Sequence, residues 1–188
     1  LVRWTQPLFN LLAKIPLLKL SDIKKEMDQP PLEERELAGA KVLFSDVVTN
    51  GIAYLSLLFD ATAVPQSKLP YAYLLTELIG AVDTAKHSYA ELANLVNLHT
   101  GGISYDLRAF SRSGEPDSCL PKFQVKAKAL TKKLPELCQI LTEILTTSSF
   151  ADKKRVRELI EQTRATLELN LLRASNQIMA SRLVSYLS

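Results

Sequence analysis

The most suggestive chemistry in the sequence belongs to a single carboxylate, Glu77, within the segment Leu-Leu-Thr-Glu-Leu that runs from Leu74 to Leu78. A glutamate on a helix can act as a general base when a metal ion or a nucleophile lies beside it. A zinc-activated water needs several nitrogen or oxygen ligands converging at about 2.0–2.2 Å, and leucine supplies none. Since no nucleophile is spaced around it either, we interpret Glu77 as a solvated or cap-bonded helix carboxylate.

The two histidines, His87 and His99, do not form a pair with metal-ligand spacing. They lie at the two ends of one predicted short helix, whereas a zinc helix places its histidines one turn apart on the same face. We therefore expect loop and cap positions for both. His99 should end the helix, where a basic side chain suits the negative end of the helix dipole.

Other catalytic and nucleic-acid patterns are weak or missing. The sequence contains no Gly-x-Ser-x-Gly elbow, no phosphate loop and no dinucleotide fingerprint. Its most basic stretch would be a phosphate track in a nucleic-acid protein, but without interleaved aromatic residues it is typical of a solvated face. We therefore expect no nucleic-acid partner. The stretch consists of Lys122, Lys126, Lys128, Lys132 and Lys133.

Composition and charge indicate an ordinary globular protein of 188 residues with a net charge of +3, which is too balanced to require a polyanionic partner. No apolar run approaches the roughly 20 residues of a membrane span, so no membrane partner is expected. The start, which lacks a methionine and a signal-peptide layout, suggests an excerpt from a longer protein. Cys119 and Cys138 are expected to be free thiols, which favours a reducing compartment, although two cysteines are enough for one bridge.

The N-terminal part differs from the rest, and we predict a lead-in over residues 1–40 and a domain over 41–188. Prolines interrupt the first segment, which predicts short helical turns, including one from Ser21-Asp22 to Met27. Residues 41–46 and 51–61 are rich in β-forming side chains. The Asn50-Gly51 pair between them predicts an antiparallel hairpin.

The following pattern predicts two helices, two strands and two more helices. The first helix follows Pro70, with an apolar face of Tyr71, Leu74, Leu75, Leu78 and Ile79 on the sheet. The second begins at Ser88, whose spacing to Glu91 fits a capping box. Strands over 103–109 and 122–130 alternate in period two and flank a predicted loop over 111–119.

The last two helices complete the predicted α+β class, an antiparallel sheet with its helices on one face. One helix begins near Pro135, and Asp152 caps a longer one from Lys153. The predicted apolar faces comprise Leu134, Leu137, Cys138, Leu141, Ile144 and Leu145 in the first, and Val156, Leu159, Ile160, Thr163, Leu167 and Leu171 in the second. The terminal segment, 167–188, stays amphipathic, so we expect an exposed apolar surface there and some tendency of the isolated chain to form a homodimer.

Three strings, at 49–60, 69–104 and 174–188, resemble the third domain of the presequence-protease-like branch of the pitrilysin/insulinase zinc metallopeptidases. The similarity runs from about Ile15 to the C-terminus. It implies a metallopeptidase-like α+β domain, truncated here, from a chain whose four related domains close around an unstructured peptide as two halves of a clamshell. Partners would then be that peptide and the remaining domains of the same polypeptide.

The resemblance also implies that zinc is held by the first domain, through a His-x-x-Glu-His helix and a later glutamate. On this sequence the two histidines correspond to Leu74 and Leu78, the helix glutamate to Glu77, and the later glutamate to Glu158 or Glu161. The resemblance therefore implies a noncatalytic domain with no catalytic residue, metal or cofactor of its own. The alternative is a free-standing inactive structural or protein-binding module of the same fold.

Overall fold

The computed structural model describes residue 22 and residues 30–186, and the chain divides into two compact units, Leu1–Val48 and Thr49–Ser188. In the first unit the strands β1 (Glu33–Leu37) and β2 (Ala40–Phe44) form an antiparallel hairpin. Ala38 and Gly39 join them with positive φ angles of 51° and 79°, as a tight hairpin turn requires. The helix predicted to end at Met27 lies outside the described residues, apart from Asp22.

The predicted hairpin between residues 41–46 and 51–61 is wrong, because β2 pairs with β1 and not with the strand after Asn50. The Asn50-Gly51 turn itself does form: both residues have positive φ, and the Ile52 amide donates to the Thr49 carbonyl at 3.1 Å. The turn leads into β3 (Ile52–Asp60), whose partner lies much later in the chain. A local turn signal therefore did not determine which strands pair.

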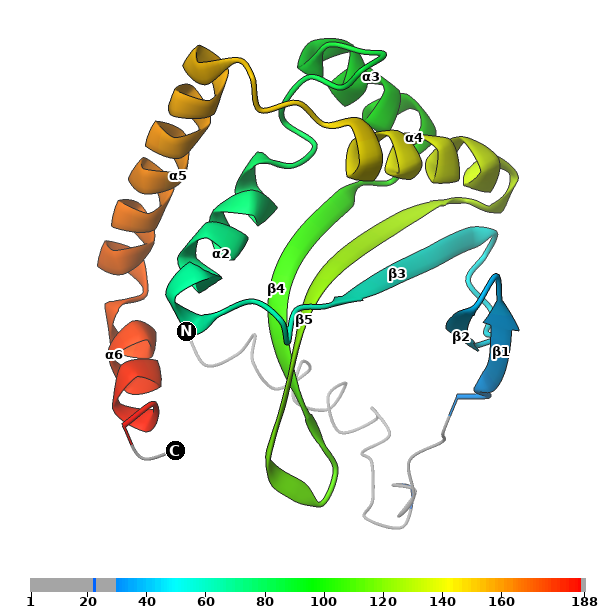
Figure 1. The fold of residues 1–188 in the computed structure, drawn as a ribbon. Coiled ribbons are helices and arrows are strands. Elements are labelled where there is room, and N and C mark those ends of the chain that lie inside the picture. The colour runs from blue at the N-terminus through cyan, green and yellow to red at the C-terminus, as the bar shows by residue number, and fades with distance from the viewer. Residues whose placement is uncertain (1–21, 23–29, 187–188) are drawn as a thin grey trace, which may run out of the picture. The chain divides into compact units, whose positions relative to one another are not determined.

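The second unit contains a three-stranded antiparallel sheet in the order β3-β5-β4 (Figure 1). β4 (Ile103–Arg112) and β5 (Glu115–Leu130) continue through most of the segment predicted as a loop over 111–119, so that prediction is wrong. Gly114, with a φ of 83°, makes the turn between them. Cross-strand pairing continues to Arg112 and Glu115, with one irregularity in the register between Phe110 and Arg112.

Helices cover one face of this sheet, which confirms the predicted α+β class. The helices in contact with the sheet are α2 (Leu69–Leu78), α3 (Tyr89–His99) and α4 (Leu134–Thr147), while α5 (Lys153–Arg173) packs on α2 and is followed by α6 (Ser175–Val184). The β5 side chains of Val125, Ala127 and Ala129 pack against Leu137 and Leu141 of α4. No helix among the described residues has the length and apolar character needed to cross a bilayer.

The apolar faces predicted from periodicity are only partly buried. On α2, Tyr71 and Leu75 are exposed, and on α4 Cys138 is exposed while Ile140 is buried. On α5, Leu159 is buried but the other leucines and Ile160 of the predicted stripe are exposed. The reason is that α5 packs with Val156 and Leu159 against α2, whereas its C-terminal half has no such cover among the described residues.

The capping box of α3 forms as predicted. The Ser88 hydroxyl accepts from the Glu91 amide at 3.4 Å, and the Glu91 carboxylate accepts from the Ser88 amide at 2.9 Å.

Replacing Ser88 with alanine is expected to lower the free energy of unfolding by about 1 kcal/mol, the usual contribution of an N-cap. Urea denaturation measures it. The control is Ser175→Ala at the start of α6, where the serine makes no capping bond; an equal loss there would contradict the assignment.

Candidate functional site

Glu77 is exposed on α2, while the two leucines that flank it in the motif turn toward α5. Leu78 is only 7% exposed and packs with Val82 and Leu159, and Leu74 packs against the same cluster. Figure 1 shows α5 lying alongside α2 at this contact. The two positions that the resemblance aligns with zinc-binding histidines therefore carry apolar side chains packed on a neighbouring helix.

The other carboxylates of interest do not join Glu77. Glu158 and Glu161 are exposed on α5, on either side of the buried Leu159, and Glu158 forms an ion pair with Arg155 at 3.8 Å. The charge of Glu77 acts instead on Tyr73, whose pKa is raised by burial and then by the Glu77 carboxylate. Within the described part of the chain, no three His, Cys, Asp or Glu side chains form a group able to hold a metal ion.

The loop that joins α2 to α3, residues 79–88, begins where its backbone lies close to a side chain of β4. Gly80 has a φ of 80°, and a Cβ at this position would lie 2.8 Å from the hydroxyl of Tyr105 on β4. Glycine is therefore required both for the backbone conformation and for the space. Burial raises the pKa of the Tyr105 phenol, which stays protonated against the loop.

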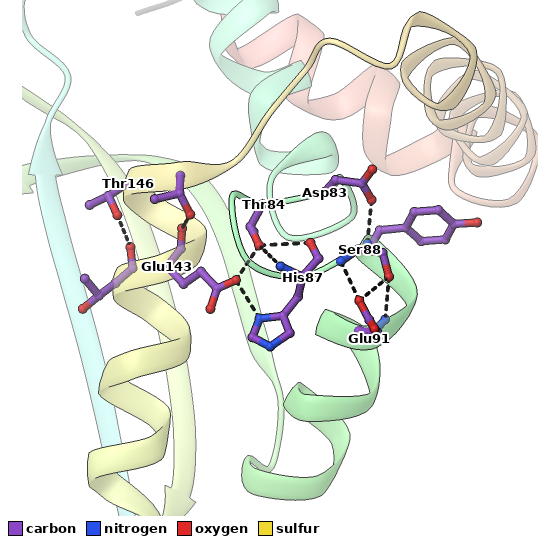
Figure 2. A network of polar contacts seen from close by, with 10 residues as sticks. Asp83, Thr84, His87, Ser88, Glu91, Glu143 and Thr146 are labelled. Atoms are coloured by element: carbon purple, nitrogen blue, oxygen red, sulfur yellow. Dashed lines mark hydrogen bonds and ion pairs between the residues drawn. The ribbon is translucent and has the colours of Figure 1, made fainter.

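His87 lies in this loop and reaches a carboxylate of α4 (Figure 2). Its Nδ1 is 2.9 Å from Oε1 of Glu143, and the hydroxyl of Thr84 donates to the same oxygen. Because an ionised carboxylate only accepts, Nδ1 carries the proton in this contact. The Glu143 side chain is 9% exposed, so the network ties the loop to α4 in a largely water-excluded position.

A second set of contacts joins the loop to α5. Nε of Arg155 donates to the Ala81 carbonyl at 3.1 Å, and its guanidinium lies 4.0 Å from the ring centroid of Tyr89. Asp83 accepts from the Tyr89 amide at 2.7 Å, as Figure 2 shows. The loop is thus tied to three helices, α3, α4 and α5.

The two histidines occupy the positions predicted for them, His87 in a loop and His99 at the last residue of α3. Nδ1 of His99 is 3.2 Å from Nζ of Lys133, which also donates to Glu136 at 3.0 Å. Both histidines line a groove of about 540 Å³ between α3 and α4. Sequence reasoning missed this groove and the role of Glu143, although that residue lies three positions after the buried Ile140, at the edge of the buried face.

A family model described as peptidase M-16C associated matches residues 6–188. The chain belongs to this peptidase-associated family. A relative named Protein HypA, from Clostridium perfringens (strain 13 / Type A), is 32% identical over 93% of the chain. Presequence protease 1, chloroplastic/mitochondrial, of Arabidopsis thaliana is 29% identical over 93% of the chain, and the mitochondrial presequence protease of Danio rerio is 23% identical over 78%.

Membership of the peptidase-associated family confirms the resemblance to the presequence-protease-like branch of the pitrilysin/insulinase peptidases. The chain corresponds to the noncatalytic associated domain of these proteins. It covers 18% of the Clostridium relative, 16% of the Arabidopsis relative and 14% of the Danio relative. The matched region is therefore a small part of each longer polypeptide.

Proposed function

We propose that this domain forms part of the wall of a clamshell chamber in a zinc-dependent peptidase that degrades unstructured peptides. The peptidase-associated family and the presequence proteases among the relatives support this proposal. The functional domain would span 41–188, with 1–40 leading in from the preceding domain. Its partners would be the remaining domains of the same polypeptide and the enclosed peptide, in a reducing compartment.

The observation that carries the noncatalytic role is the apolar contact between α2 and α5. Leu74 and Leu78, which correspond to the metal-binding histidines of the family motif, pack with Leu159 in one cluster. A zinc ion at this position would lack the nitrogen ligands that it requires, because leucine side chains have no donor atom for a metal. Catalytic zinc would belong to the first domain of the longer polypeptide, and this domain would enclose the substrate.

The test is a zinc measurement on the purified chain together with one substitution. Elemental analysis after purification without chelators is expected to give far less than one zinc per chain. In the longer polypeptide, Glu77→Gln is expected to leave kcat/KM for a flexible peptide within about twofold, because a glutamate outside the chemistry contributes little to the transition state. Stoichiometric zinc in the chain, lost on Glu77→Gln, would contradict the proposal.

A further inference from the structure

The face of the sheet opposite the helices carries a pocket with charged and hydroxyl side chains at its border. Side chains of β5 alternate, so Val125 and Ala127 face the helices while Lys126 and Lys128 face the other way. Together with residues of the flanking strands they line a pocket of about 480 Å³, a size typical of ligand sites. The residues used below are Tyr54, Ser56, Gly101, Ser104, Lys126 and Lys128.

The two lysines of this pocket have no carboxylate partner among the described residues. The acidic residues on the same face are engaged farther along the strands: Asp60 pairs with Lys122 at 3.4 Å, and Asp106 lies 3.8 Å from Arg108. Lys126 and Lys128 are both exposed and lie two residues apart on the central strand. Two unneutralised ammonium groups on one side of a sheet create a positive potential that attracts an anion.

Hydroxyl groups border the same position. By cross-strand register Lys126 lies between Ser56 on β3 and Ser104 on β4, and Tyr54 lies opposite Lys128. The amide nitrogen of Gln124, a residue only 7% exposed, donates to the Ser56 oxygen at 2.9 Å. Since Ser56 accepts this bond, its own proton remains available for an anionic ligand.

Gly101 shapes the wall of the pocket. A Cβ at this position would lie 2.9 Å from Cγ of Lys128, so the lysine stem lies directly against the glycine backbone. The Gly101 amide also donates to the Lys128 carbonyl at 2.7 Å. The backbone and the lysine stem are therefore held together, which limits the positions open to the ammonium group and lowers the entropy lost on binding.

We propose that this pocket binds a carboxylate group of a peptide, either an acidic side chain or the C-terminal carboxylate. The choice of a peptide rests on the proposed function, in which the domain encloses peptide substrates. Ammonium and hydroxyl donors form charge-assisted hydrogen bonds to a carboxylate. A nucleic acid fits less well, because Tyr54 is the one aromatic side chain among the described residues that line the pocket, and strand-tracking sites need a series of stacking rings.

The test is fluorescence anisotropy of the purified chain with a short flexible labelled peptide that carries aspartates and a free C-terminus. Lys126→Gln combined with Lys128→Gln is expected to weaken binding about tenfold, since both charged donors are removed. The matched control, Lys153→Gln with Lys154→Gln, removes two exposed lysines at the start of α5 and is expected to change affinity by less than about twofold.

A peptide with asparagines in place of the aspartates and an amidated C-terminus separates charge from sequence. We expect this neutral peptide to bind about tenfold more weakly than the acidic one, and to respond to neither lysine pair. Equal binding of the two peptides, or an unchanged affinity in the Lys126/Lys128 variant, would overturn the proposal. Tighter, lysine-dependent binding of single-stranded DNA would overturn it in favour of a nucleic-acid ligand. Neither result bears on the zinc and Glu77 measurements, so the proposed function is tested separately.

Discussion

Replacing Leu78 with histidine is expected to lower the free energy of unfolding by about 3 kcal/mol. In the proposed alignment this histidine would stand at a metal-ligand position of the family motif, but in this fold the side chain enters the apolar cluster with Val82 and Leu159. The leucine contacts are lost, and the imidazole nitrogens enter a site lined by side chains that cannot hydrogen-bond to them. Urea denaturation of the purified chain, followed by circular dichroism, measures the difference.

Leu75→His is the matched control, because it makes the same chemical change on the same helix at a position that is 38% exposed. It is expected to change the free energy of unfolding by no more than about 0.5 kcal/mol. If the two variants lost the same stability, the contact between α2 and α5 would not be a core. The idea that apolar packing has replaced the metal site would then fail as well.

Helices and strands were predictable from the sequence where the residues that determine them lie within a few positions of one another. The Ser88 and Glu91 pair determined where α3 begins, since Ser88 is the N-cap and Glu91 lies in the first turn of that helix. The strict alternation of apolar and polar residues over 122–130 predicted a strand, and this strand is the central one of the sheet. Side chains of a strand point alternately to the two faces of the sheet, so a strand with one buried face has an apolar residue at every second position. In both cases the deciding interactions are short in sequence or repeat along the element.

Pairing between distant segments was not predictable in this way. The Asn50-Gly51 turn forms, yet β3 pairs with β5, more than sixty residues later, and β2 pairs with β1. The predicted loop over 111–119 forms strand for a similar reason, since two long strands continue to pair until Gly114 turns the chain. Strand partners depend on tertiary packing, which a local turn motif does not encode.

The candidate site shows the same division. The resemblance implied that Leu74 and Leu78 stand at metal-ligand positions, which stays a prediction, but only the fold shows that they pack against Leu159. His87 could be placed in a loop from the sequence, whereas its partner Glu143 lies 56 residues away in the chain, on α4. Periodicity also overstated the buried face of α5, because an amphipathic pattern states which side is apolar and not what covers it.

Replacing Glu143 with alanine is expected to lower the free energy of unfolding by about 2 kcal/mol at pH 7. The variant removes the acceptor shared by Thr84 and His87: the Thr84 hydroxyl keeps the His87 carbonyl as an acceptor at 3.0 Å, whereas Nδ1 of His87 loses its partner in a partly buried network. The control is Gln139→Ala, an exposed position on the same helix, which is expected to stay within about 0.5 kcal/mol. Equal losses would mean that the network does not hold the loop to α4.

Wild type and Glu143→Ala can also be compared as a function of pH, and the ionisation of the Glu143 carboxyl determines the direction in which their stability difference changes. Burial alone raises the pKa of Glu143, but hydrogen bonds from Thr84 and His87 and the charges of His87 and Lys86 outweigh it, so the pKa is lowered. A carboxyl whose pKa is lower in the folded state stabilises the protein above its unfolded pKa of about 4.3, and this contribution is lost as the pH falls through the folded value. The difference in free energy of unfolding between wild type and Glu143→Ala should therefore be full at pH 7 and shrink from about pH 5 downward.

Other carboxyls with lowered pKa values, such as Asp60 and Glu91, are present in both proteins and cancel in the difference. A difference that stayed constant from pH 7 to pH 3 would mean that Glu143 acts through packing alone and not as an ionised partner of His87.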